Sequence, residues 1–541
     1  MNQLREDTRL PTDERVRVFG GRRILALDGT EPEAFATRGE RIVASGSRAE
    51  LLDRFPGGEL IDLDGALVVP GFNDAHCHPS QAALARIRVD LTATQTPEDL
   101  REGLRARASA VPAGEWVVAQ AFDERRPGMG AVDRAFLDSV SREHPVVVVH
   151  YTFHKAVANS RALEILGYRT PEDAPYGGQL MTNVDGELNG WLIERAWLDP
   201  WLPGSGRDSI VPVGEESAQV AALAEVNAEL HAVGITSYCD AIVTPTEQDM
   251  YSAALSRGRL TPRVAMLLWH SYFDEASWTP SAAPEDRLRL AGVKLMLDGA
   301  LSGGTCLCQQ PYASATGRDN GLQIVSDEDF ATTVRRVHAA GARVAVHANG
   351  DLAISKVLDA VESLPKPEKP INHRIEHCSI VDDRIIQRII AAGVTPVPFG
   401  AFIHFHGEAI EAFYGTERAA RACAHRSMLA AGLAVAGSSD FPLVPIDPLL
   451  AVQSMVTRRS RGGGVFGAGQ RLSVAEALGV YTHGSAHATG EAAVKGRLTP
   501  GQLADFAVLD KDVTKIGAEE LRDVAVRSTW VGGKCVYRDS S

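Results

Sequence analysis

The sequence predicts an α/β protein whose main domain is a (β/α)8 barrel of the TIM type. Two patterns predict the barrel: short apolar runs alternate with amphipathic helical stretches, and residue types that bind metals follow several of those runs. A third pattern, short alternating strands near both ends of the chain, predicts a composite β-sandwich domain beside the barrel. We also expect a long insertion after the first barrel strand.

The predicted barrel strands are apolar runs, each short enough for a parallel strand that is buried on both faces. The same number of strands would also fit an open, doubly wound sheet, which stays open as an alternative at this point. The strands are expected at residues 67–72, 234–239, 263–268, 291–297, 343–347, 372–377, 394–397 and 433–440.

A chain of 541 residues exceeds the size at which a single hydrophobic core stops growing, so we expect more than one domain. Residues 1–70 and 490–541 are predicted to form the composite β-sandwich, with the two ends pairing into one sheet structure. Residues 71–489 are predicted to form the barrel. One crossover helix cannot fill the gap between the first two strands, so residues 80–231 should fold as an insertion with strands of its own, one of them at 145–149.

Composition restricts the classes of partner. The net charge is -14 and no basic block occurs, which disfavours nucleic acid as a partner. No apolar run approaches the length of a membrane span, and the charged opening segment lacks the apolar core of a secretory signal, so we expect a cytoplasmic protein. The 7 cysteines do not form a disulfide framework. We expect a small-molecule substrate, and a homodimer is one candidate assembly.

Histidines and an aspartate stand at the ends of several predicted strands. His76 and His78 directly follow the first strand and project to one side, because side chains alternate along a strand. Such a pair can hold a metal ion, although paired histidines also occur in structural roles. His347, His377 and Asp440 each end another predicted strand, which is where barrel active sites are assembled. Together these residues form a ligand set suited to zinc and similar ions.

Lys294 lies in the apolar strand predicted at 291–297, where an ammonium group is poorly solvated. One interpretation is an edge residue whose charged end reaches water along its own stem. The other is that burial lowers the pKa of the amine and favours the neutral form, which reacts with CO2 to give a carbamate. A carbamate is an anionic ligand that can bridge two metal ions.

In these motifs the chain resembles amidohydrolase family 3, and in particular its branch of N-substituted formamide deformylases and related amide hydrolases. The resemblance spans nearly the whole chain, and the segments 71–79, 374–377 and 437–442 carry it most specifically. It implies two zinc-type ions bridged by carbamylated Lys294, with Asp440 taking the proton from metal-bound water. The metal ligands it implies are His76, His78, Lys294, His347, His377 and Asp440.

Four further residues are candidates for substrate contacts: His154, Asn159, Gly303 and Thr305. The segments 154–163 and 185–194 also resemble features of this branch and fall inside the predicted insertion. The alternative is a structural insertion in which His154 satisfies a loop carbonyl.

The loop after Lys294 departs from the family pattern. The family often continues with Asp-Gly-Ser-Leu-Gly-Ser, whereas residues 298–303 here read Asp-Gly-Ala-Leu-Ser-Gly, which leaves the substrate open. Cys306 and Cys308 would face the same way in an extended chain. One interpretation is an extra metal-binding or redox role, and the other is that both are buried structural thiols. Aromatic residues near predicted loops suggest a hydrophobic N-substituent on the substrate: Tyr151, Phe153, Trp191 and Phe402.

The sequence therefore predicts a metal-dependent hydrolase that cleaves a non-peptide carbon–nitrogen bond in an amide, formamide or cyclic imide. Metal-activated hydroxide would attack the carbonyl, and Asp440 would pass the proton to the leaving nitrogen. Deamination is an alternative, although many deaminases place a glutamate where this chain has Gly350. Ester or lactone hydrolysis would need the same groups. A non-catalytic metal-binding regulator is the remaining alternative, and the intact set of ligand-type residues disfavours it.

Overall fold

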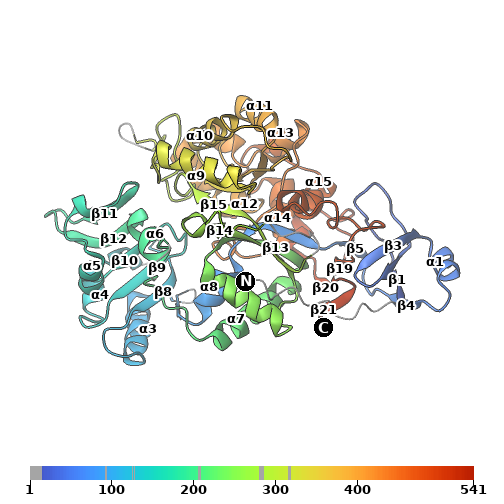
Figure 1. Ribbon diagram of the computed structural model, residues 1–541, viewed down its shortest axis with the longest axis horizontal. Helices are drawn as coiled ribbons and strands as arrows, with labels where there is room; N and C mark the ends of the chain where they lie inside the picture. Colours follow the sequence, from blue (N-terminus) through green and yellow to red (C-terminus); the bar gives the residue numbers. More distant parts are fainter. Residues whose placement is uncertain are drawn as a thin grey trace.

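The structure is a computed structural model that describes residues 15–91, 94–124, 126, 128–204, 209–279, 286–314 and 319–540. A central α/β barrel lies between two smaller β-rich parts, the insertion on one side and the domain built from the chain ends on the other (Figure 1). The opening residues 1–14, which the sequence assigns to the composite domain, lie outside the described residues. Within the described residues, no helix is both long and apolar enough to cross a membrane.

The predicted barrel class is confirmed. A 7-stranded sheet, parallel throughout, runs in the order β18-β17-β16-β15-β14-β13-β6. The carboxyl ends of all its strands therefore meet at one rim, where barrel enzymes assemble their active sites. The strands are β6 (Phe72–Cys77), β13 (Ile235–Val243), β14 (Arg263–Trp269), β15 (Leu288–Met296), β16 (Val344–Ala348), β17 (Arg374–His377) and β18 (Thr395–Val397).

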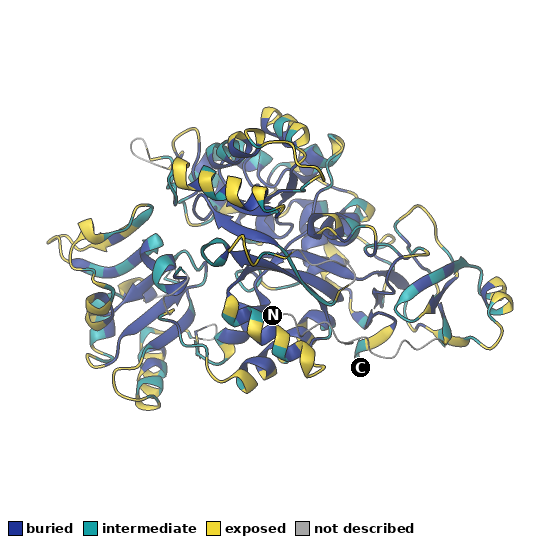
Figure 2. Cartoon of the chain, viewed as in Figure 1, coloured by how far each residue is buried: buried dark blue, intermediate teal, exposed yellow. Residues whose placement is uncertain are grey.

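Helices cover the outside of this barrel, with buried faces turned to the strands and exposed faces outward (Figure 2). The strand runs are apolar along most of their length because they are covered on both sides. The helices are α2 (Pro79–Arg86), α7 (Glu216–Ala232), α8 (Pro245–Ser256), α9 (Asp327–Ala339), α10 (Asp351–Glu362), α11 (Asp383–Ala392), α12 (Phe402–Arg421), α13 (His425–Ala430), α14 (Pro448–Thr457), α15 (Val474–Gly479) and α16 (Ser485–Thr489).

The expected eighth strand, residues 433–440, is not a regular strand, which corrects that prediction. The segment closes the ring by single hydrogen bonds: Ala75 N donates to Gly437 O (2.9 Å) and Asp440 N donates to His76 O (3.0 Å). The N–H of Gly437 instead donates to Val480 O (2.9 Å) and Ser485 Oγ (3.0 Å), so a continuous ladder with β6 cannot form. The barrel is nevertheless closed at this seam.

The expected first strand is split in two. β5 (Leu67–Pro70) pairs with a strand from the C-terminal end of the chain, and only β6 enters the barrel. Gly71 stands between them, and a Cβ at this position would lie 2.2 Å from Oγ1 of Thr236. A glycine is therefore required where the chain passes from one sheet to the other.

The insertion is built on a 6-stranded sheet with the order β11-β12-β10-β9-β8-β7. Its elements occupy residues 89–201 of the expected 80–231 range, whereas α2 and α7, at the two ends of that range, pack on the barrel. The elements are β7 (Val89–Asp90), α3 (Pro97–Ser109), β8 (Val117–Phe122), α4 (Arg134–Asp138), β9 (Val146–His150), β10 (Lys155–Ala158), α5 (Ser160–Leu166), β11 (Gly178–Thr182), β12 (Leu188–Glu194) and α6 (Arg195–Trp201).

The two chain ends form two stacked sheets, the arrangement of a β-sandwich. Their facing sides share an aromatic cluster in which Phe506 and Trp530 stack with ring centroids 5.5 Å apart and Phe19 meets both. Each sheet has 4 strands. One contains β1 (Val16–Gly20), β2 (Ala34–Arg38), β3 (Arg41–Gly46) and β4 (Glu59–Asp62), with α1 (Arg48–Arg54) beside it, and the other contains β5, β19 (Phe506–Leu509), β20 (Val526–Val531) and β21 (Lys534–Arg538).

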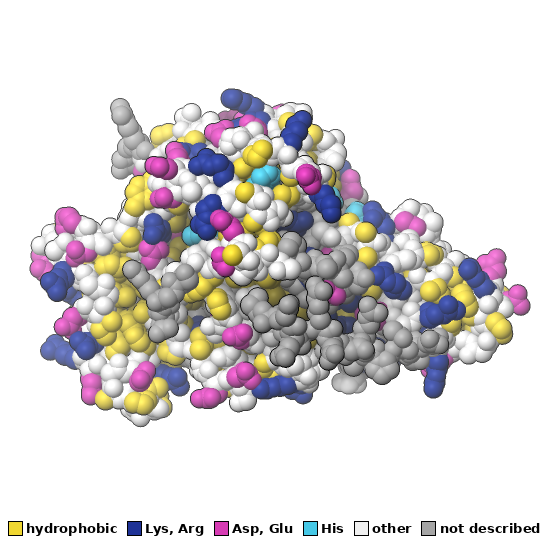
Figure 3. Space-filling model, viewed as in Figure 1, with side chains coloured by type: hydrophobic (Ala, Val, Ile, Leu, Met, Phe, Trp, Pro, Cys, Tyr) yellow, Lys and Arg dark blue, Asp and Glu magenta, His cyan; other side chains and the backbone are white. Residues whose placement is uncertain are grey.

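A buried ion-pair group joins this composite domain to the barrel. Arg263, at the start of β14, lies 2.8 Å from Asp505 and 2.6 Å from Glu40. On the surface, acidic and basic side chains are interspersed over the face shown in Figure 3. The charge of the chain is therefore spread over that face, as the sequence suggested.

Candidate metal centre

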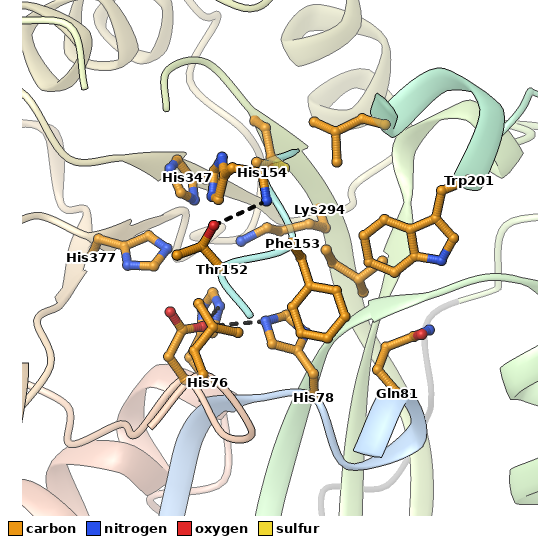
Figure 4. Close-up of a pocket in the computed structure, with 15 residues that line it drawn as sticks. His76, His78, Gln81, Thr152, Phe153, His154, Trp201, Lys294, His347 and His377 are labelled. Atoms are coloured by element: carbon orange, nitrogen blue, oxygen red, sulfur yellow. Dashed lines mark hydrogen bonds and ion pairs between the residues drawn. The ribbon is translucent and has the colours of Figure 1, made fainter. Parts of the chain in front are cut away.

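A cavity opens at the carboxyl ends of the barrel strands, beneath a loop of the insertion. The cavity and its mouth contain about 470 Å³ of space. Figure 4 shows His76, His78, Lys294, His347 and His377 turned toward this space. Asp440 lines it as well, so the structure brings all the sequence-predicted ligands to one cavity.

His76, His78 and Asp440 form the most compact group in the cavity. Oδ1 of Asp440 lies 3.4 Å from Nε2 of His76 and 3.3 Å from Nε2 of His78. Two ligand atoms held about 2.0–2.1 Å from one tetrahedral zinc ion would be separated by roughly 3.4 Å. All three side chains are buried, and Nδ1 of His78 has no hydrogen-bond partner among the described residues. The spacing and chemistry of these donors therefore fit a divalent metal ion.

Buried residues beyond the cavity wall hold His76 in place. Nδ1 of His76 contacts the carboxylate of Glu376, which leaves Nε2 free to face Asp440. Both oxygens of Glu376 accept hydrogen bonds from Arg374, at 2.7 and 2.8 Å, and Arg374 also donates to Ala75 O (2.7 Å). A carboxylate on the far nitrogen of a ligating histidine fixes its tautomer and ring orientation.

His347 and His377 form a second group, with ring centroids 4.2 Å apart. Nε2 of His347 lies 3.1 Å from both Gly299 O and Nδ2 of Asn349, so Nδ1 is the ring nitrogen left for a ligand. Nδ1 of His377 is buried without a hydrogen-bond partner among the described residues. These two imidazoles could therefore bind a second metal ion, next to the group of His76, His78 and Asp440.

Electrostatics favour neutral imidazoles in this cavity. Burial, reinforced by the positive charge of Lys294, holds the pKa of His76, His347 and His377 well below the usual range. Histidine must be neutral to bind a metal, so the site is prepared for ligation at neutral pH.

Lys294 is fully enclosed and lines the same cavity, with only 1% of its surface exposed. The alternative of an edge residue reaching solvent is therefore wrong. Burial lowers the pKa of Lys294 to about 8, against the charges of Glu376 and Asp440, which raise it. At pH 7 about a tenth of such an amine is neutral, far more than for an exposed lysine.

The insertion supplies His154, which lines the cavity 5.3 Å from His347, centroid to centroid. Its Nδ1 contacts the buried carboxylate of Glu194, whose other oxygen lies 3.0 Å from Oγ1 of Thr305. Burial alone would lower the pKa of His154, but the charge and hydrogen bond of Glu194 raise it. The three residues come from β12 and two separate loops, so this group connects the insertion to the barrel.

The other candidate contacts lie elsewhere. The amide of Asn159 accepts from Val146 N and Ala162 N and donates to two backbone carbonyls of the insertion, which makes it a capping residue for α5. Gly303 is exposed on the loop after β15. Neither lines the cavity. Thr305 does not line the cavity either, and its hydroxyl is linked to the cavity residue His154 through Glu194.

Cys306 and Cys308 are buried, with their sulfur atoms 3.9 Å apart. Cys306 donates to Oη of Tyr414 at 3.2 Å, and burial raises the pKa of this thiol. Both pack in an apolar cluster outside the cavity, which supports the structural interpretation.

The sequence found some residues of the site and missed others. Phe153, which the sequence suggested, lines the cavity and stacks on Trp201, which it did not suggest, whereas Trp191 packs inside the insertion. Glu376 could have been noticed, because Arg374 and Glu376 share one face of an otherwise buried strand. Nothing in the sequence pattern points to Gln81 or Trp201.

A parallel barrel that gathers imidazoles, a carboxylate and a buried lysine at the carboxyl ends of its strands defines a metal-dependent hydrolase. The chain belongs to the amidohydrolase family, whose sequence model matches residues 59–537. The resemblance seen in the sequence is thus confirmed.

Known proteins resemble the chain over nearly its full length. It is 28% identical to a putative amidohydrolase, YtcJ, of Bacillus subtilis, over 95% of this chain and 97% of that protein. It is 27% identical to the N-substituted formamide deformylase of Arthrobacter pascens, over 98% of this chain and 96% of the enzyme. An uncharacterized metal-dependent hydrolase from Pyrococcus horikoshii has the same fold, with a TM-score of 0.74, 24% identity and coverage of 94% and 99% of the two chains.

Proposed function

We propose that this protein hydrolyses a non-peptide carbon–nitrogen bond in an amide, formamide or cyclic imide. The observation that carries the proposal is the position of Asp440, whose carboxylate lies within 3.4 Å of both His76 and His78 in the cavity. The N-substituted formamide deformylase among the relatives supports this class of bond.

The residues that would hold metal are His76, His78 and Asp440, together with His347 and His377. Lys294, once carbamylated, would supply a further anionic ligand. Divalent zinc bound there would supply Lewis acidity and bring the pKa of water to about 7. Asp440 accepts the proton released by the attacking water and carries it to the leaving nitrogen. Glu376 holds the ring of His76, and His154, fixed by Glu194, orients the substrate from the insertion side.

Deamination that depends on a glutamate three residues after His347 does not fit this chain. Gly350 occupies that position, and a Cβ there would lie 1.9 Å from the carbonyl oxygen of Leu307. No side chain can therefore be accommodated at residue 350 without moving the loop after β15.

The test is a substrate panel on protein reconstituted with zinc, cobalt or manganese. We expect turnover of N-substituted formamides, acyl amides or cyclic imides with release of a carboxylate and an amine. Asp440→Asn should reduce kcat by at least about a hundredfold, the scale of a lost general base. Ammonia release from aminated heterocycles without amide hydrolysis would favour a deaminase, and no turnover by metal-loaded protein would favour the regulator.

A further inference from the structure

The cavity continues from the metal ligands into a wall that is largely apolar. Trp201 and Phe153 stack with ring centroids 5.4 Å apart and form part of this wall. Gln81, on α2 one helical turn after His78, lies beside it (Figure 4). The other apolar side chains of the wall are Leu198, Ile242, Met296 and Leu443.

The amide of Gln81 is held in one orientation. Its Nε2 donates to Oε1 of the buried Glu247 at 3.0 Å. The other oxygen of Glu247 accepts from Thr244 N (2.8 Å) and from the hydroxyl of Thr244, in the capping box of α8. Because a carboxylate only accepts hydrogen bonds, the nitrogen of Gln81 is turned to Glu247 and its oxygen is left without a donor in the cavity wall.

That oxygen is an unpaired acceptor in a closed place. Gln81 is 2% exposed, and its Oε1 has no hydrogen-bond partner in the part of the chain that the structure describes. Buried polar atoms in native proteins are almost always paired, and the exceptions need an explanation. A ligand that brings an N–H group to this wall would provide the missing partner.

We propose that Gln81 accepts a hydrogen bond from the N–H of the substrate and thereby selects secondary amides. The inference rests on the proposed function and narrows it. An ester or lactone would place an oxygen lone pair against the oxygen of Gln81, and an N,N-disubstituted amide would place a carbon there. A site with a buried acceptor rejects analogues that lack the donor, because the acceptor is then left unpaired.

The alternative role for Gln81 is to brace α2 against α8 through Glu247. The two roles make different predictions. Loss of a brace would weaken binding of every substrate equally, whereas loss of an acceptor would weaken only the binding of compounds that carry the N–H group.

The experiment compares N-benzylformamide with benzyl formate, which replaces the N–H by oxygen at equal size, and with N-benzyl-N-methylformamide. Dissociation constants are measured by calorimetry on zinc-loaded Asp440→Asn protein, in which turnover is slow. The same measurements are made with Gln81→Met added, and melting temperatures establish that each variant is folded.

With Gln81 present, we expect N-benzylformamide to bind at least about tenfold more tightly than either analogue. With Gln81→Met, the preference should fall to within about threefold, entirely through weaker binding of N-benzylformamide. Glu247→Gln should give an intermediate preference, because its NH2 group would face Gln81 and compete with the substrate for the oxygen of Gln81.

An unchanged preference in Gln81→Met, equal weakening of all three compounds, or no binding of N-benzylformamide would overturn the inference. If the preference depends on Gln81 but the unmodified enzyme hydrolyses no amide, the proposed function fails while the role of Gln81 stands. The two proposals can therefore fail separately.

Discussion

Nδ1 of His154 lies 2.8 Å from Oε2 of Glu194, a carboxylate with no exposed surface. This contact fixes a histidine of the insertion over a cavity whose proposed metal ligands all belong to the barrel. The backbone of Glu194 has a φ of 49°, an unusual conformation for a residue other than glycine. Strain of this kind persists where the surrounding structure enforces it and clusters at functional sites.

Glu194→Gln should lower kcat/KM on an amide substrate by about tenfold to a hundredfold, because the ring of His154 loses its charged partner. Metal content should stay the same, since neither residue belongs to the proposed ligand set. Steady-state kinetics and elemental analysis check both points. Thr305→Val serves as the control and should have a smaller effect, because it removes a neutral contact to Glu194 and the hydrogen bond that the Thr305 hydroxyl accepts from Ala300 N (2.9 Å). A fall in metal content equal to the fall in activity would contradict the assignment.

Glu376→Gln should weaken metal binding by about tenfold to a hundredfold, because it removes the carboxylate behind a proposed ligand. Titration against a competing chelator measures the change. Glu491→Gln is the matched control, since Glu491 is also a buried carboxylate paired with cations but does not contact a proposed ligand. Equal weakening in both variants would mean that Glu376 acts only on the stability of the barrel.

Lys294→Ala should reduce the metal content from about two ions per chain to about one, because the bridging ligand is lost. Elemental analysis of protein purified without added metal measures this. Lys495→Ala is the control, because Lys495 is also buried but pairs with Glu491 outside the cavity. A metal content that Lys294→Ala leaves unchanged would reduce Lys294 to a structural residue.

Protonation of Glu491 at low pH should lower the free energy of unfolding. Burial raises the pKa of this carboxyl, but the charges of Lys495 and Arg289 outweigh burial and lower it to about 2. A carboxyl whose pKa is lower in the folded state than in the unfolded state stabilises the fold above the unfolded pKa of about 4.3. That contribution is lost as the pH falls toward 2.

Glu491→Gln should therefore lower the melting temperature of metal-free protein by a few degrees at pH 7, and the difference should shrink between pH 5 and pH 2.5. Thermal unfolding across this range is the measurement. Glu519→Gln breaks an exposed pair with Arg459, at 3.1 Å, and should change little at any pH. If the melting temperature of Glu491→Gln stays below that of the unmodified protein by the same amount at every pH, the low pKa assigned to Glu491 is contradicted.

Most of the barrel could be predicted from the sequence because its strands are short apolar runs separated by helices. The strand at 263–268 was predicted almost to its bounds, since β14 covers Arg263–Trp269. Local pattern could not show that the run at 67–72 divides at Gly71, because the division depends on the contact with Thr236 on the neighbouring strand β13. The prediction of a regular strand at 433–440 was wrong for a similar reason. The N–H of Gly437 donates to the carbonyl of Val480, which is distant in the sequence, and so cannot pair with β6.

The residues of the candidate site could also be predicted only in part from the sequence. Strand alternation and strand ends indicated which imidazoles would face the cavity. The pattern could not reveal that Glu376 supports His76 or that Glu247 turns the amide of Gln81, because these contacts join distant parts of the chain. Asn159 resembled a family feature, yet its amide is used entirely by the backbone of the insertion.

The compact group of His76, His78 and Asp440 straddles the seam where the barrel closes. Ser439 N donates to Asp74 there, a contact that joins positions 365 residues apart. A chain emerging from the ribosome exposes its two histidines long before the aspartate is made. Only a chain that extends to Asp440 can assemble the proposed ligand set, and an ion bound there would tie the last part of the ring to the first. On the proposed function, metal retention would therefore distinguish such chains from fragments that end before residue 440.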